Sequence, residues 1–474
     1  MPLSTNPERS SNLQYLDKSS LMDKYMHIQD NKDMNSKYSH GTGIGFHYFP
    51  DDSHYRSADI DHWLPKLHDL GATWLTLVSS TNRSIPETFL SPLIQSGIEP
   101  IIHIKTDHIM PLDIDEMDST MHAYANWGVK YLCIFDCPNI RTSWKSGDFD
   151  QKNLVERFVD CWIPIAQLQL AYGLPAILPP LNQGGTYWDT SFLSTVLKTI
   201  IDRQHHEILD NLILAIYSLA GAHAADWGRG GNKAWPASQP YRTPPGSQDQ
   251  TGFWSFNWYA EVMENIIGET RPMLMLAGGA RRGQIDPKTN QKKDTAWHTT
   301  CNTTIAHAML AGHLPDYLLN VNYWLLCAQA DDVESDDAWL PNKGLIAPAA
   351  KELKNMIAKS YPDMVTLGKE YINSLNTKKS LKHYILLPRF NWGLSEWHWN
   401  MAGPLVQDHD ACCGYSVDTA LLAETVTILA NHHEVGLDVE NKLKQSGCTT
   451  HRINYENLDT MTHNKEPLST NMLM

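Results

Sequence analysis

Short apolar runs alternate with longer amphipathic segments over most of the chain, beginning at residue 43. The runs are about four to nine residues long and are bounded by turn residues, as β-strands are. Strands separated by helix-length segments are typical of repeated βα units around a parallel sheet. We predict eight strands of this kind, at residues 43–49, 73–78, 99–104, 131–135, 175–178, 212–217, 272–276 and 318–326.

The segments between these strands carry apolar residues at helical spacing. In residues 60–70, Ile60, Trp63 and Leu67 share one face with two further leucines, and Gly71 is placed to end the helix. Similar helices are predicted at residues 85–96, 118–127, 153–172, 192–210, 254–268 and 295–312. Eight strands are the number that closes a barrel, so the predicted fold class is α/β, with a (β/α)₈ TIM barrel over residues 43–360.

Polar sequence flanks the predicted barrel. Residues 1–42 are rich in Ser, Asn, Asp and Lys and are predicted to be a disordered tail, and residues 361–380 a linker. A second series of strands follows at residues 383–387, 412–415, 426–429 and 450–453, with helices at 396–408, 418–424 and 437–446. We therefore expect a small α/β sandwich domain at residues 381–460 and a second disordered tail at 461–474.

Charge and composition narrow the possible partners. With 38 Lys and Arg against 53 Asp and Glu, the net charge of −15 disfavours nucleic acid as a partner. The first forty residues hold no sustained apolar run, so we expect no signal peptide, no membrane span and a cytoplasmic location, with export by another route still possible. Cys133 and Cys137 lack a second ligand pair, so neither a metal nor another cofactor is predicted.

Candidate ligand-binding residues follow the predicted strands, because the working groups of a TIM barrel gather at the carboxyl ends of its strands. They include aromatic, amide, carboxyl, imidazole and guanidinium groups, which stack on sugar rings or hydrogen-bond to hydroxyl groups. Any one Trp could instead seal a loop, so the prediction of a carbohydrate ligand rests on the whole set. The set is His47, Asp51, Asp52, His103, Asn139, Asn182, Tyr187, Trp188, Tyr217, Arg281, Arg282, Asn322 and Trp324.

Three strand ends carry a resemblance to the clan A glycoside hydrolases, which include many cellulases, β-galactosidases and β-xylosidases. The segment YLCIFDCPNIRTSW (131–144) is similar to the fourth strand of these enzymes, which ends in Asn-Glu-Pro-Asn. The segment MLMLAGGARRGQ (273–284) is similar to their seventh strand, and NVNYWLL (320–326) to their eighth, with its Trp at the sugar site. The resemblance covers most of residues 43–350 and implies a barrel with a sugar site at its mouth.

The same resemblance implies two catalytic glutamates, and this sequence has neither of them. Asp136 falls on the family's Asn position, Cys137 on the acid/base Glu and Ala277 on the nucleophilic Glu. A methyl group cannot attack an anomeric carbon, and a thiol with the ordinary pKa of about 8.5 is a poor proton donor to a glycosidic oxygen. We therefore expect a carbohydrate-binding barrel of glycoside hydrolase type without the retaining machinery, a pseudoenzyme.

Two other functions stay open. In the first, relocated carboxylates make an active glycosidase that cleaves O-glycosyl bonds; Asp136 would pair with Asp51, Asp52, Asp189 or Asp226 in an inverting arrangement. Cys137 could instead act as a nucleophile, with His103 or His223 as its base. In the second, the barrel is a non-catalytic scaffold for an unidentified protein partner.

Two further features have more than one interpretation. Arg281 and Arg282 could clamp the carboxylate or phosphate of an acidic sugar, or they could neutralise acids in neighbouring loops, such as Asp226 or Asp286. Residues 414–453 weakly resemble the cell-wall-binding repeats of some bacterial surface proteins. A generic α/β accessory domain has the same pattern.

Overall fold

The computed structural model describes residues 41–81, 83–286, 289–341, 345–361, 379, 381–390, 394–409 and 411–454. The chain divides into two compact units, residues 1–53 with 71–356 and residues 54–70 with 357–474. Most of the predicted tails and of the predicted linker lies outside the described residues. Thr42, at the end of the predicted first tail, is buried, and its hydroxyl donates a hydrogen bond to the Gly71 carbonyl at 2.5 Å.

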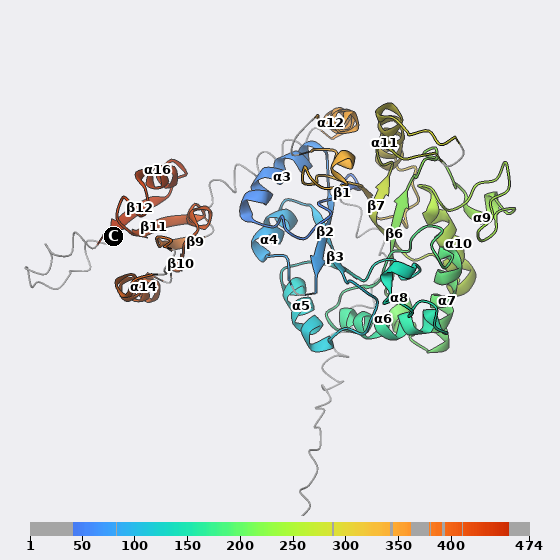
Figure 1. Ribbon diagram of the computed structural model, residues 1–474, viewed down its shortest axis with the longest axis horizontal. Coiled ribbons are helices and arrows are strands. Elements are labelled where there is room, and N and C mark those ends of the chain that lie inside the picture. Colours follow the sequence, from blue (N-terminus) through green and yellow to red (C-terminus); the bar gives the residue numbers. More distant parts are fainter. Residues whose placement is uncertain are drawn as a thin grey trace, which may run out of the picture. The chain divides into compact units, whose positions relative to one another are not determined.

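The first unit contains a parallel barrel of eight strands (Figure 1). Neighbouring strands follow the order β4-β3-β2-β1-β8-β7-β6-β5, so that β1 pairs with both β2 and β8. Strands β4 and β5 stand at the two ends of this order. The segments that follow them meet where the Cys137 amide donates to the Pro180 carbonyl at 3.1 Å. The predicted fold class is confirmed. The strands are β1 (Ile44–His47), β2 (Trp74–Ser80), β3 (Glu99–Lys105), β4 (Tyr131–Ile134), β5 (Ala176–Leu178), β6 (Leu212–Leu219), β7 (Met273–Gly279) and β8 (Val321–Tyr323).

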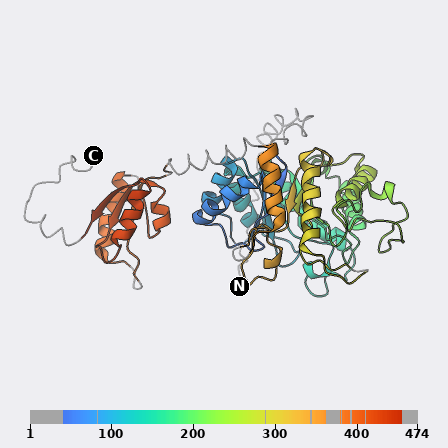
Figure 2. The ribbon, with the colours of Figure 1, turned by 90° about the horizontal axis from the view of Figure 1, so that it is seen from above.

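Helices follow the strands in the predicted alternation, and Figure 2 shows α11 (yellow) along the outside of the barrel. One prediction is wrong: residues 192–210 do not form a single helix, because Gln204 adopts a left-handed φ of 61° between α7 and α8. The helices before the second sheet are α3 (Ser57–Asp69), α4 (Glu87–Gln95), α5 (Ile114–Asn126), α6 (Leu154–Ala171), α7 (Asp189–Asp202), α8 (His206–Asp210), α9 (Gly231–Ala234), α10 (Ser255–Ile267), α11 (Thr295–Leu310) and α12 (Pro348–Ser360).

Side chains fill the inside of the barrel, so it is a packed core and not a pore. A Cβ atom on Gly45 would lie 2.0 Å from Asn322 Oδ1 and 2.5 Å from the Trp74 carbonyl oxygen, so only glycine fits there. Groups that can meet a ligand must therefore lie above this layer, at the carboxyl ends of the strands. The interior cluster consists of Trp74, Ile101, Tyr131, Cys133, Ile177, Ile213, Ala215, Leu274, Leu276 and Leu319, with Tyr217 packed against it.

The second sheet has four parallel strands in the order β10-β9-β11-β12. Apolar residues cover both of its faces: Ile385 and Leu429 belong to a cluster with Ala402 of α14, and Val426 to a cluster with Leu443 of α16. This arrangement is the small α/β unit that the sequence predicts. Its elements are β9 (Leu381–Leu386), α14 (Glu396–His409), β10 (Cys412–Gly414), α15 (Val417–Ala420), β11 (Ala423–Leu429), α16 (Leu437–Gln445) and β12 (Thr449–Ile453).

The predicted helix at 418–424 is too long. Helix α15 ends at Ala420, and β11 begins at Ala423. Pairing of β11 with both β9 and β12 overrides the local helical preference of this segment. Within the part of the chain that the structure describes, no helix has the length and apolar character needed to cross a membrane.

Candidate functional site at the barrel mouth

The carboxyl ends of β4 and β6 bring Asp136 and Tyr217 together. The Tyr217 hydroxyl donates to Asp136 Oδ1 at 2.9 Å, and the Cys137 thiol donates to the same oxygen at 3.2 Å. Strand β4 ends one residue earlier than predicted because Phe135 turns out of the ladder with a φ of 74°. The second carboxylate oxygen of Asp136 has no hydrogen-bond donor among the described residues and is available to a ligand.

Cys137 does not have the environment of a nucleophile. Burial raises the pKa of its thiol well above the ordinary value, and the charge of Asp136 raises it further. A reactive cysteine needs a lowered pKa. Of the two proposed bases, His103 uses Nε2 to bond the Phe135 carbonyl at 2.9 Å, and His223 stacks on Trp227 with 4.1 Å between ring centroids.

Ala277 lies on the interior side of β7, next to Tyr217. The register shifts after Ile216, which pairs with Met275, so that Tyr217 pairs with Ala277 and Leu276 is skipped. Paired residues of neighbouring strands project to the same face of a sheet, and Tyr217 packs against the interior cluster. Ala277 is 2 % exposed and is therefore buried beside Tyr217.

Three rings at the mouth carry nitrogens that have no hydrogen-bond partner among the described residues. His47, at the end of β1, is fully buried, and both of its ring nitrogens are unpartnered. Its ring lies against Trp324 with 4.5 Å between centroids, and the Trp324 indole nitrogen is also unpartnered, as is Nδ1 of His103. Burial lowers the pKa of His47 well below its ordinary value, so the ring is neutral and offers one donor and one acceptor.

Lys105 and Glu334 add charge to the mouth. The Lys105 ammonium group, at the end of β3, makes no hydrogen bond or ion pair with the described residues. Its charge adds to burial in lowering the pKa of both His47 and His103. Burial raises the pKa of Glu334, and the charge of Lys105 reduces that rise. Glu334 pairs with Arg281 at 3.4 Å, and Arg281 lies over the Trp324 ring, so the loop after β8 brings a carboxylate to the mouth.

Arg281 and Arg282 are held by the loop that follows β8. Arg281 forms an ion pair with Asp337 at 2.6 Å and a longer one with Glu334 at 3.4 Å, and its guanidinium lies 5.4 Å from the Trp324 ring centroid. Arg282 donates to the Ala338 carbonyl at 2.6 Å. Arg281 thus neutralises Glu334 and Asp337 of this loop, whereas the sequence analysis gave Asp226 and Asp286 as examples.

Asn139 connects the ends of β4 and β5. Its amide nitrogen donates to the carbonyls of Asn182 and Tyr187 at 2.8 and 3.0 Å, and its amide oxygen accepts from the Asn182 amide at 2.9 Å. The side chain is fully buried, so it positions the loop that carries Tyr187 and Trp188. Trp188 in turn packs against Tyr241 with 4.8 Å between ring centroids.

The carboxylates considered as partners of Asp136 have other surroundings. Asp189 is buried and accepts hydrogen bonds from Tyr259 and Gln250, both at 2.7 Å. Asp51 accepts from the Ser53 amide at 2.8 Å, which fixes a turn after β1, where Asp52 also lies. Asn322 donates to the Thr76 hydroxyl at 2.7 Å inside the barrel.

No protein-family model and no curated protein matches this sequence. Among solved structures, a family 39 glycoside hydrolase from Bacteroides cellulosilyticus is similar, with a TM-score of 0.42 and 11% identity over 66% of this chain and 64% of that one. The chain thus covers slightly less than two thirds of that enzyme. A GH128 endo-β-1,3-glucanase from Sorangium cellulosum is similar with a TM-score of 0.38 and 12% identity over 66% of this chain and 97% of that one. A β-glucosidase from Thermotoga maritima is similar with a TM-score of 0.39 and 11% identity over 65% of this chain and 87% of that one.

The described residues of the mouth combine neutral donors and acceptors with two carboxylates and an unpaired ammonium group. Sequence reasoning found Asp136, Tyr217, His47, His103 and Trp324 but gave no role to Glu334. The signal for Glu334 was the acidic segment DDVESDD, which begins a few residues after β8. No group of three or more metal-ligating side chains among the described residues could hold a metal ion.

Proposed function

We propose that the barrel mouth binds a carbohydrate and does not perform retaining hydrolysis. The observation that carries the proposal is the set of unpartnered ring nitrogens on His47, His103 and Trp324. A buried polar atom without a partner costs about 1–3 kcal/mol, and a bound molecule with hydroxyl groups can remove that cost. Sugar hydroxyls suit such a surface because each can both donate and accept a hydrogen bond.

Two neighbouring features support the choice of a sugar. Trp324 is only partly buried, and an indole ring can pack against the apolar face of a pyranose. Asp136 keeps one free carboxylate oxygen, which can accept from a sugar hydroxyl. The absence of catalysis is argued from the resemblance at residues 131–144 and 273–284, which aligns Cys137 and Ala277 with the two catalytic glutamates of the clan A hydrolases; neither a methyl group nor a thiol of raised pKa can replace a glutamate.

A glycan panel tests this proposal directly. Binding of neutral oligosaccharides is measured by calorimetry, and cleavage is measured as reducing ends released by the same purified chain. We expect saturable binding without cleavage. Because Asp136 contributes a hydrogen bond to the ligand, Asp136→Asn should weaken binding about tenfold. Cleavage above the level of the buffer blank contradicts the proposal, and the absence of any binding favours the scaffold function.

A second candidate function is an active hydrolase that uses Asp136 and Glu334. The position of Glu334 beside Arg281 and its raised pKa favour it, because a carboxyl group of raised pKa is a better general acid at neutral pH than an ordinary one. An inverting enzyme places its two carboxyl groups about 6.5–9.5 Å apart. This function predicts that Glu334→Gln and Asp136→Asn each reduce turnover by about 100-fold or more. The exposed Asp336, two residues after Glu334, supplies the matched control Asp336→Asn, which should leave turnover unchanged.

A further inference from the structure

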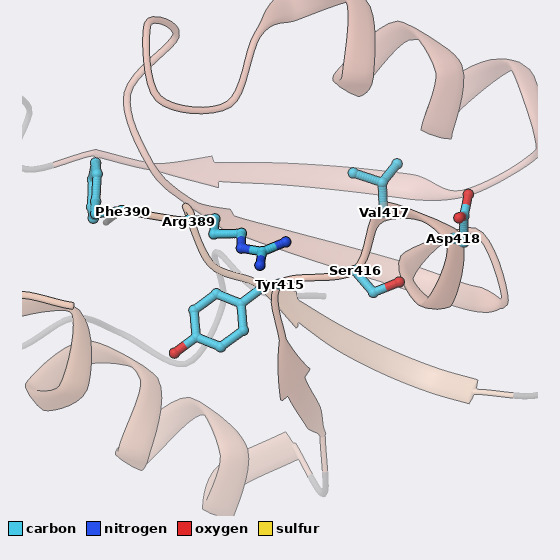
Figure 3. A pocket seen from close by; sticks show the side chains of 6 residues that line it. All are labelled: Arg389, Phe390, Tyr415, Ser416, Val417 and Asp418. Carbon is cyan, nitrogen blue, oxygen red and sulfur yellow. The ribbon is translucent and has the colours of Figure 1, made fainter. Parts of the chain in front are cut away.

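The second sheet has an open hollow at the carboxyl ends of β9 and β10 (Figure 3). Its volume is about 600 Å³. Two of its residues, Arg389 and Phe390, follow β9, and the others follow β10. Parallel α/β sheets bind their ligands outside the carboxyl ends of the strands, so this hollow has the position of a binding site. The residues that line it are Arg389, Phe390, Tyr415, Ser416, Val417 and Asp418.

Arg389 is the distinctive group of the hollow. Its guanidinium lies between Tyr415 and Ser416 in Figure 3, and it makes no hydrogen bond or ion pair with any described residue. The one acid that lines the hollow, Asp418, has its own partner, Lys442, at 3.8 Å. Among the described residues, the hollow therefore presents a guanidinium whose charge is not neutralised and whose N–H groups can donate to a ligand.

The other side chains of the hollow indicate which groups a ligand would carry besides an anionic one. Phe390 and Tyr415 supply two aromatic rings, and Tyr415 is 50% exposed. The Ser416 hydroxyl accepts a hydrogen bond from the Thr419 amide at 3.1 Å and can still donate one. Guanidinium groups bind carboxylates and phosphates through two parallel hydrogen bonds, and aromatic rings pack against the apolar face of a small ring.

We propose that this hollow binds a small ring compound of sugar size that carries an oxyanion, with Arg389 as the partner of the oxyanion. The shared chemistry is a carboxylate or a phosphate group. The site is independent of the barrel mouth, since no residue of the mouth contributes to it. Its ligand differs from the neutral sugar proposed there, because the charged group of the hollow is a guanidinium without an acidic partner among the described residues, whereas the mouth combines neutral ring nitrogens and the Lys105 ammonium group with two carboxylates.

The test uses calorimetry on the full chain with three probes: glucose 6-phosphate, glucuronate and glucose. We expect one or both of the charged sugars to bind and glucose to leave this site empty; which charged sugar binds more tightly distinguishes phosphate from carboxylate. Arg389→Gln should reduce the affinity at least about tenfold, because it removes a charge-assisted hydrogen bond. The affinity of Arg389→Lys should lie between those of the wild-type chain and Arg389→Gln, because lysine keeps the charge but lacks the planar guanidinium group.

The controls separate this site from the mouth. Lys382 is another exposed cation on β9, outside the hollow, so Lys382→Gln changes the net charge equally and should leave the affinity unchanged. Asp136→Asn at the mouth should also have no effect on the charged sugars. The proposal is overturned if neither charged sugar binds, if Arg389→Gln binds as tightly as the wild-type chain, or if Lys382→Gln loses as much affinity as Arg389→Gln. Arg389 is exposed and unpaired, so its replacement leaves no buried group without a partner, and circular dichroism should show an unchanged fold.

Discussion

Both units gather polar side chains at the carboxyl ends of parallel strands, but the two sets differ in burial and charge. At the barrel mouth, the rings of His47 and His103 are fully buried and neutral, and Arg281 is paired with acids. At the edge of the second sheet, Arg389 is exposed and has no hydrogen-bond or ion-pair partner among the residues that the structure describes. The same location in two α/β folds therefore supports two different kinds of recognition.

The arrangement of the strands explains the difference, because eight strands form a nearly closed barrel and four form an open sheet. Eight strand ends and their loops surround the mouth, and there Arg281 has two acidic partners, Asp337 and Glu334, while Lys105 faces neutral histidines and the same acidic loop. A sheet of four strands leaves its edge open to solvent, and a guanidinium can remain there unpaired at little cost. The mouth is thus suited to hydroxyl groups, and the open edge to an anion that supplies the missing charge.

The largest effect that sharpens this comparison is a loss of barrel stability in acid. Burial lowers the pKa of His103 from 6.5 to about 4. Because the folded pKa lies below the unfolded one, the stability from neutral His103 is complete above pH 6.5 and is lost as the pH falls toward 4. The full shift corresponds to about 3 kcal/mol, of which about 2 kcal/mol should be lost between pH 7 and pH 5. Calorimetric unfolding of the chain at pH 7 and pH 5 measures it.

A single-residue variant isolates this contribution from groups that act in the opposite sense, such as Asp189, whose pKa is raised by burial. His103→Gln keeps a donor that can reach the Phe135 carbonyl but cannot be protonated. Its unfolding free energy should fall less between pH 7 and pH 5 than that of the wild-type chain. An equal fall in both proteins would show that His103 does not couple folding to pH.

The next effect concerns ligand binding by aromatic rings in the two units. Trp324→Ala removes the ring that packs against His47 and Arg281, so binding of a neutral oligosaccharide should weaken by about 30-fold, equivalent to about 2 kcal/mol. Trp399→Ala in α14 is the matched control, because that side chain is 57% exposed. Binding of glucose 6-phosphate should not change in either variant. Equal losses of oligosaccharide affinity from both variants would contradict a specific contact between Trp324 and the ligand.

The sequence predicted the eight-stranded barrel because the spacing of apolar runs depends on local pattern alone. It also placed Asp136 and Tyr217 among the candidate residues at the carboxyl ends of the strands, and the hydrogen bond between them is evident only in the structure. The resemblance at residues 131–144 and 273–284 directed attention to Cys137 and Ala277, and the structure puts Ala277 on the interior side of β7.

The remaining features depend on contacts between distant segments. Glu334 reaches the mouth because Arg281, more than fifty residues earlier, pairs with it and with Asp337. The bonds of Asn139 to the loop after β5 are equally invisible to local pattern. Arg389 was not singled out because an arginine after a strand has no distinctive sequence context, and its lack of a partner is evident only in three dimensions.

The smallest effect tests the electrostatics of the open edge. Asp418 lines the same hollow as Arg389. Its side chain is 64% exposed and forms an ion pair with Lys442. Removing this charge with Asp418→Asn should strengthen binding of glucose 6-phosphate by about twofold, since exposed charge pairs are worth less than about 1 kcal/mol. The gain should shrink as salt is raised, because the interaction is screened. Calorimetry at two salt concentrations measures both, and weaker binding by the variant would mean that Asp418 contacts the ligand directly, which contradicts an oxyanion held by Arg389 alone.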